Sequence, residues 1–216
     1  KITLLRNPKD FILSNKKVMS ALNLAYLAYN SKYKLRRHYT IFWPDGVFGK
    51  IVRNDIKVPG RVILKKFIKY LNKKPKLKVY MLGTLSHTSK EWLRRNLNIN
   101  YMYVNLPNGN VDKIIRSIRN HKYENNSLLI LIIPTPKQEI IANYIISKNP
   151  NLKILCIGGS LNIISGEEKA VPRLLNYLNL EWLWRLRYDS RRRVQRLCET
   201  IYITIKLFIN RSNSLY

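Results

Sequence analysis

Short apolar segments recur along the chain and alternate with stretches in which apolar residues return every three or four positions. The short segments are residues 2–5, 39–43, 77–82, 99–104, 128–133 and 154–157. Runs of this length predict β-strands, and 128–133, which has no polar residue, predicts a central strand buried on both faces. Glycine, proline or asparagine follows most of them, which is typical of strand ends.

The stretches between these segments predict helices. Asn7 and Pro8 supply a helix cap and a proline at the first helical position. The helix that they begin would carry on one side Phe11, Val18, Leu22, Ala25 and Tyr26. Further helices are predicted after residues 58–60, at 86–96 and at 111–120. Because strand and helix alternate throughout, the sequence predicts an α/β fold with a Rossmann-like, largely parallel sheet flanked by helices.

The C-terminal part of the chain has a different character. Gly166 opens a predicted long helix whose apolar positions recur at helical spacing, namely Leu174, Leu175, Leu178, Trp182 and Leu186. Residues 200–209 fit a strand or a helix by periodicity, and the helical pattern and basic flank before them favour a helix. We therefore divide the chain into an α/β domain, residues 1–179, and a basic helical C-terminal appendage, residues 180–216.

The charge of the chain is strongly positive. Forty Lys and Arg against twelve Asp and Glu give a net charge of +28 over 216 residues. Such a surface attracts phosphates, anionic lipid or nucleic acid, although solvated surface charge is the ordinary role of lysine. No apolar run approaches the roughly 20 residues that span a bilayer. Cys156, Cys198 and three scattered histidines show no metal-ligand spacing, and no D-x-D motif occurs.

Several short motifs occur in an order that carries a family resemblance. They are N-P at residues 7–8, W-P-D-G at 43–46, V-P-G at 58–60, P-K-Q-E at 136–139, G-G-S-L-N-x-x-S-G-E-x-K at 158–169, Pro172, L-E-W-L-W-R-L at 180–186 and an arginine-rich tail. This ordered set resembles the WecG/TagA/CpsF glycosyltransferases over about residues 2–197. The resemblance implies an α/β catalytic domain, a UDP-sugar donor and a lipid-diphosphate-linked acceptor. Because the sequence shows no metal-ligand spacing, we expect no metal or other cofactor.

Asp45 is the candidate general base. It follows a predicted strand end, and Gly46 beside it leaves room for a substrate. The same P-D-G sequence is also an ordinary turn in which aspartate bonds to its own backbone. The family resemblance implies that this aspartate removes a proton from the acceptor hydroxyl.

The other candidate residues have structural alternatives as well. Thr135, Pro136 and Gln138 fit a helix capping box, whereas the resemblance places Gln138 and Glu139 at the nucleotide-sugar site. Asn7 is either a helix cap or a substrate contact, and residues 158–160 are either a tight turn or a nucleotide site. The donor- and acceptor-binding residues that we expect are Asn7, Gly46, Gly83, Pro136, Lys137, Gln138, Glu139, Gly158, Gly159, Ser160, Asn162, Gly166, Glu181, Arg185 and Arg192.

The arginine-rich tail is the expected phosphate-binding element. Arg185, Arg192 and Arg196 recur at helical spacings, and guanidinium groups bind phosphate oxygens bidentately. The alternative is a solvated basic face. The family pattern more often has threonine, aspartate and arginine at the positions of Leu5, Asn162 and Ala170.

The sequence therefore predicts an inverting glycosyltransferase of surface polysaccharide synthesis, cytoplasmic and peripheral at an anionic membrane surface. A homo-oligomer is left open. One rival is a nucleic-acid-binding protein, since basic residues interleaved with fourteen tyrosines can track phosphates and stack bases. Another is an inactive family member that serves as a membrane-bound partner, which the departures at Asn162 and Ala170 suggest.

Overall fold

Six short strands form one parallel sheet in the computed structural model, which describes residues 7–33, 39–45, 58–169, 171–177, 180–188 and 190–212. The strands are β1 (Val18–Leu22), β2 (Thr40–Pro44), β3 (Val79–Gly83), β4 (Tyr101–Asn105), β5 (Leu128–Ile132) and β6 (Lys153–Cys156). Their order across the sheet is β2-β1-β6-β5-β3-β4, and every pairing is parallel. The predicted α/β fold is confirmed. The strand expected at 2–5 lies outside the described residues.

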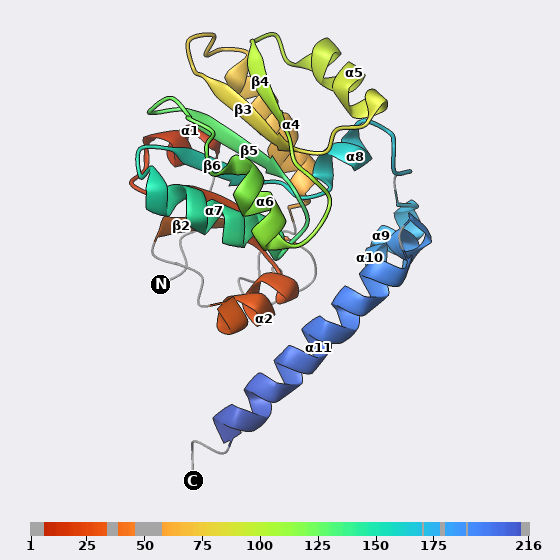
Figure 1. The fold of residues 1–216 in the computed structure, drawn as a ribbon. Coiled ribbons are helices and arrows are strands. Elements are labelled where there is room, and N and C mark those ends of the chain that lie inside the picture. Colours follow the sequence, from red (N-terminus) through yellow and green to blue (C-terminus); the bar gives the residue numbers. More distant parts are fainter. Residues whose placement is uncertain are drawn as a thin grey trace.

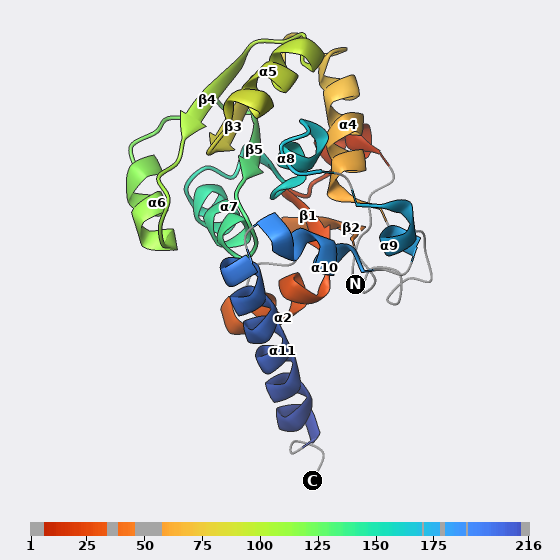
Figure 2. The same cartoon turned by 90° about the vertical axis from the view of Figure 1, so that its right-hand side faces the viewer.

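Helices cover both faces of the sheet (Figures 1 and 2). One face packs against α1 (Pro8–Leu13), α4 (Gly60–Leu71), α5 (His87–Asn96) and α8 (Ser160–Ile164), around the fully buried Phe67 and Leu155. The other packs against α6 (Val111–Ile118) and α7 (Lys137–Lys148), around Leu129 and Ile141. α2 (Leu24–Tyr33) adds a small cluster that contains Tyr26 and Phe42. As predicted, all five residues of β5 are buried.

The long N-terminal helix predicted from Asn7 onward is wrong. The chain forms α1, then the central strand β1, then α2. Val18, Leu22 and Tyr26 recur every four residues as on a helix, but all five residues of β1 are buried between β2 and β6. The position of this segment in the sheet determines that it forms a strand, because the periodicity of a short apolar run does not distinguish a strand from a helix.

The C-terminal helix also begins later than predicted. Instead of one helix after Gly166, the chain forms α9 (Arg173–Tyr177), α10 (Glu181–Arg185), the 3₁₀ turn η2 (Leu186–Tyr188) and then α11 (Ser190–Ser212). The N–H of Leu180 donates to the carbonyl of Leu175 at 2.8 Å, which closes a turn between α9 and α10. The described part of 200–209 lies in α11, so the preference for a helix there is confirmed.

α11 projects beyond the rest of the chain (Figure 1). Its 23 residues extend for about 35 Å. It packs against α2, where the Glu199 carboxylate accepts from the Tyr29 hydroxyl at 2.8 Å and pairs with Lys32 at 2.8 Å. Among the described residues, none of the helices is long and apolar enough to cross a membrane.

Candidate functional site

A cavity of about 740 Å³ lies at the carboxyl edge of the sheet. The strands all run in one direction, so their carboxyl ends meet there, the usual place for a ligand in open α/β sheets. Each strand contributes a residue from its end or just after it, namely Ala21, Trp43, Gly83, Leu106, Ile132 and Cys156. α11 lines the cavity from another side through Arg193, Arg196, Leu197 and Thr200. We call this cavity the edge pocket.

Asp45 lines the edge pocket directly after β2. Its backbone N–H donates to the carbonyl of Leu22 at 3.1 Å, which continues the ladder between β1 and β2 by one step. Trp43, which is 2% exposed, packs in the core two residues before it. A buried strand therefore carries the aspartate to the pocket wall. Gly46, the other candidate in this motif, lies outside the described residues.

Two glycines let the backbone approach the edge pocket. Gly83 has φ of +152°, and a Cβ on it would stand 2.6 Å from the carbonyl oxygen of Ile132 on β5. Gly158 has φ of +55°, in the left-handed region that favours glycine. Both residues line the pocket, as do Gly159 in the turn between β6 and α8, and Ser160 and Asn162 in the first turn of α8.

Gln138 connects two of the predicted motifs. Its Oε1 accepts from the N–H of Gly158 at 2.9 Å, and its Nε2 donates to Thr135 Oγ1 at 3.1 Å and to Glu139 Oε1 at 2.8 Å. The predicted capping box is wrong, because α7 begins at Lys137 with no capping side chain and Gln138 bonds to Gly158, Thr135 and Glu139 instead. Thr135, Lys137 and Gln138 line the edge pocket, and the Lys137 ammonium donates to the carbonyl of Gly109.

Glu139 lies behind the edge pocket. It is 4% exposed, and burial raises the pKa of its carboxyl group. Its Oε1 accepts hydrogen bonds from Ser20, Thr135 and Gln138, whereas its Oε2 has no hydrogen-bond partner among the described residues. Neither Glu139 nor Pro136 is among the described residues that line the pocket.

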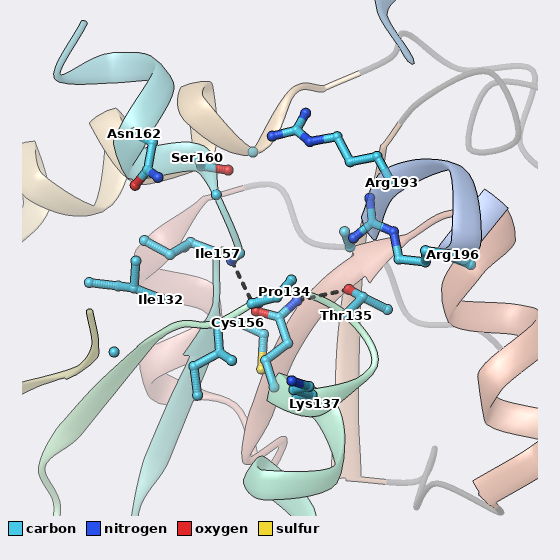
Figure 3. Close-up of a pocket in the computed structure, with 18 of the residues that line it drawn as sticks. Ile132, Pro134, Thr135, Lys137, Cys156, Ile157, Ser160, Asn162, Arg193 and Arg196 are labelled. Carbon is cyan, nitrogen blue, oxygen red and sulfur yellow. Dashed lines mark hydrogen bonds between the residues drawn. The ribbon is translucent and has the colours of Figure 1, made fainter. Parts of the chain in front are cut away.

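Arg193 and Arg196 reach toward the edge pocket from α11, across from Ser160 and Asn162 (Figure 3). A guanidinium nitrogen of Arg193 lies 2.6 Å from Glu168, in an ion pair whose side chains are 17% and 12% exposed. The sequence prediction missed Arg193, because it assumed one helix that continued from residue 185. The side chains of Arg185 and Arg192 lie outside the described residues.

The remaining candidates occupy different places. Glu181 lines the pocket and lies 3.4 Å from Arg61 of α4. Asn7 is exposed and caps α1 by accepting from the N–H of Asp10 at 3.0 Å. Asn7 and Gly166 are not among the described residues that line the pocket. The described ranges contain no group of three or more His, Cys, Asp or Glu residues that could hold a metal ion.

The comparisons with known proteins agree with this geometry. Residues 18–215, a span from the first residue of β1 to beyond α11, match the model of a family described as the glycosyl transferase WecG/TagA/CpsF family. No individual curated protein matches the chain. Because the match covers nearly the whole sequence, the resemblance carried by the ordered motifs is confirmed, and the chain belongs to the glycosyl transferase WecG/TagA/CpsF family.

Proposed function

We propose that this chain is an inverting glycosyltransferase that moves a sugar from a UDP-sugar to a polyprenyl-diphosphate-linked saccharide in surface polysaccharide synthesis, such as cell wall or capsule. The observation that carries the proposal is the composition of the edge pocket. A carboxylate, Asp45, shares one cavity with the glycine turn at Gly158 and with the arginines Arg193 and Arg196. A general base and a phosphate-binding group are the two elements that this reaction requires.

The proposed reaction is a single displacement. Asp45 takes the proton from a hydroxyl of the acceptor sugar, and the oxygen forms a bond to the anomeric carbon of the sugar donor. The bond between that carbon and the diphosphate breaks on the opposite side, so the configuration inverts and UDP leaves with the electron pair. Arg193 and Arg196 stabilise the negative charge that develops on UDP. In this proposal the arginines fill the role that a metal ion has in other transferases.

We further propose that residues 180–216 act as an appendage that brings the pocket to an anionic membrane surface on the cytoplasmic side. α11 supports this proposal, because Val194, Ile201, Tyr202 and Ile205 are exposed on a helix that begins with a run of arginines. Basic residues near an anionic surface contribute about 1 kcal/mol each. The lipid-linked acceptor would then meet the pocket at the membrane.

The test is UDP release from a panel of UDP-sugars, with a detergent-solubilised N-acetylglucosaminyl-diphosphate lipid as acceptor. We expect acceptor-dependent release from one sugar donor. In Asp45→Asn the rate should fall by about 10² to 10⁴, the usual contribution of a general base, while UDP binding persists. Asp10→Asn, an exposed aspartate on α1, is the matched control and should keep full activity.

Two outcomes would contradict the proposal. Full activity of Asp45→Asn would exclude this residue as the base. Failure of every sugar donor, combined with RNA or DNA binding that weakens steeply with salt, would favour a nucleic-acid-binding protein. A reaction in EDTA tests whether the arginines stabilise the charge on the leaving UDP without a metal ion. Loss of turnover in EDTA would assign that role to a metal ion instead.

A further inference from the structure

The carboxyl group of Glu139 is buried behind the edge pocket, and one of its two oxygens accepts three hydrogen bonds. Oε1 accepts from Ser20 Oγ at 2.9 Å, from Thr135 Oγ1 at 3.1 Å and from Gln138 Nε2 at 2.8 Å. The three donors come from β1, from the segment after β5 and from α7. The other oxygen, Oε2, has no hydrogen-bond partner within the ranges that the structure describes. A small cavity beside the carboxyl group is lined by Thr40 and Asn143, among others.

This arrangement determines which way the Gln138 amide faces. The amide nitrogen has two hydrogens, and both are used, one toward Glu139 Oε1 and one toward Thr135 Oγ1. The amide oxygen must therefore face the N–H of Gly158, which it accepts at 2.9 Å. If the amide were turned by 180°, its NH₂ group would face the N–H of Gly158, donor against donor. Its oxygen would face the carboxylate oxygen of Glu139, acceptor against acceptor. Glu139 thus selects one amide orientation.

The selected orientation reaches the pocket through Gly158. This residue has φ of +55° and begins the turn whose Gly158, Gly159 and Ser160 line the edge pocket. Gln138 is 3% exposed, and both of its amide hydrogens are donated to other side chains of the protein, so it cannot donate to a ligand. Its main effect on a ligand must come through the turn that it holds.

We infer that Glu139 is a positioning residue, which acts through Gln138 to hold the Gly158 turn in the conformation that receives the diphosphate or sugar of the donor. The inference rests on the proposed function for the identity of that ligand. A purely structural role explains the site less well, because burying a carboxylate is costly and its Oε2 has no hydrogen-bond partner in the described part of the chain. Such costs are typical of functional sites.

The test is a double-mutant cycle with Glu139→Gln, Gln138→Met and the two together, using UDP as the probe. Glu139→Gln keeps the shape of the side chain but replaces one acceptor with a donor. We expect it to weaken UDP binding by about 10-fold, the effect of one or two lost hydrogen bonds. In the Gln138→Met background the same change should have less than about a 2-fold effect, because the connection is already broken.

Ser20→Ala is the matched control. It removes a hydrogen bond to the same carboxylate oxygen from β1, but leaves the amide of Gln138 with all three of its partners. UDP affinity should change by less than about 3-fold in this variant, even where thermal stability falls. Equal and additive losses of affinity from Glu139→Gln and Gln138→Met would overturn the inference, as would unchanged UDP binding in Glu139→Gln.

Hydrogen exchange of the Gly158 amide in the ligand-free protein separates this inference from the proposed function. Exchange should accelerate by about 10-fold or more in Glu139→Gln, because the hydrogen bond from Gly158 to Gln138 is weakened. It should accelerate no further in the double variant, because that same hydrogen bond can be lost only once. If the wild-type protein binds no UDP, the proposed donor is wrong and exchange alone decides whether Glu139 positions the turn. Unchanged Gly158 exchange in Glu139→Gln would refute the positioning role.

Discussion

The substitution Gly83→Ala probes how closely two central strands approach each other at the edge pocket. Gly83 ends β3 and is in register with Ile132 of β5 and Asn105 of β4. A methyl group on Gly83 would stand 2.6 Å from the Ile132 carbonyl oxygen and 2.9 Å from the Ile132 Cβ. These atoms belong to a strand held between β6 and β3, so they cannot move away cheaply.

The expected cost has two parts. A residue with a Cβ at φ near +152° is strained, which costs about 1 to 3 kcal/mol. Overpacking against a rigid backbone costs about 1 to 3 kcal/mol more. The sum, about 2 to 6 kcal/mol, is a large part of the stability of an ordinary domain. It should lower Tm by at least about 4 °C in a chain of this length.

The measurement is thermal and urea unfolding of Gly83→Ala beside Gly159→Ala. Gly159 also lines the edge pocket, but a Cβ there would meet no atom within 4 Å. Gly159→Ala should therefore keep its Tm and, because its methyl group enters the pocket, weaken UDP binding. A Gly83→Ala variant as stable as Gly159→Ala would refute the reasoning about the close approach of β3 and β5.

Two further substitutions test the attachment of α11 and a half-buried cation. Glu168→Gln breaks the partly buried pair with Arg193 at 2.6 Å, so we expect a loss of about 1 to 3 kcal/mol and faster tryptic cleavage within α11. Lys153, whose ammonium donates to three backbone carbonyls, has its pKa lowered to about 8, first by burial and then by Lys17. Between pH 8 and 10.5 the unfolded chain therefore binds more protons than the folded chain. The free energy of unfolding of the wild-type protein should rise with pH in this range, compared with that of Lys153→Met, as urea titrations would measure.

Much of the fold could be predicted because its central strands are continuous apolar runs with clear ends. The run at 128–133 is long enough, and apolar enough, that only a strand buried on both faces fits it well. β1 could not be recognised in this way, because Val18 and Leu22 have the same spacing as residues on a helix. Only its neighbours β2 and β6 make it a strand, and their proximity is a property of the folded chain.

The candidate site was predictable where it depended on local sequence. Asp45 and the turn at Gly158 both follow apolar strands, and parallel strands bring such residues to one edge. The contact between Gln138 and Gly158 depends instead on β5 and β6 being neighbours. Arg193 was missed because the phase of α11 is set where it begins, at Ser190, after the turns that separate it from α10.

The scarce acidic residues explain why a basic helix stays against a basic protein. Forty Lys and Arg face twelve Asp and Glu, so α11 and the body of the chain repel each other on average. Two carboxylates lie at their junction, where Glu168 faces Arg193 and Glu199 faces Lys32, and Glu181 of the preceding helix α10 faces Arg61.

Of these pairs, only the Lys32–Glu199 pair is exposed, and such a pair contributes little by itself. Together with the partly buried Glu168–Arg193 pair, it determines which face of α11 turns toward the edge pocket. The pairs involve the first half of the helix, through residues 193 and 199, whereas Ile201, Tyr202 and Ile205 farther along are exposed. A polyanion at the pocket would compete with Glu168 for Arg193. If UDP is the ligand, its binding and the attachment of α11 should therefore be linked, and Glu168→Gln should change both.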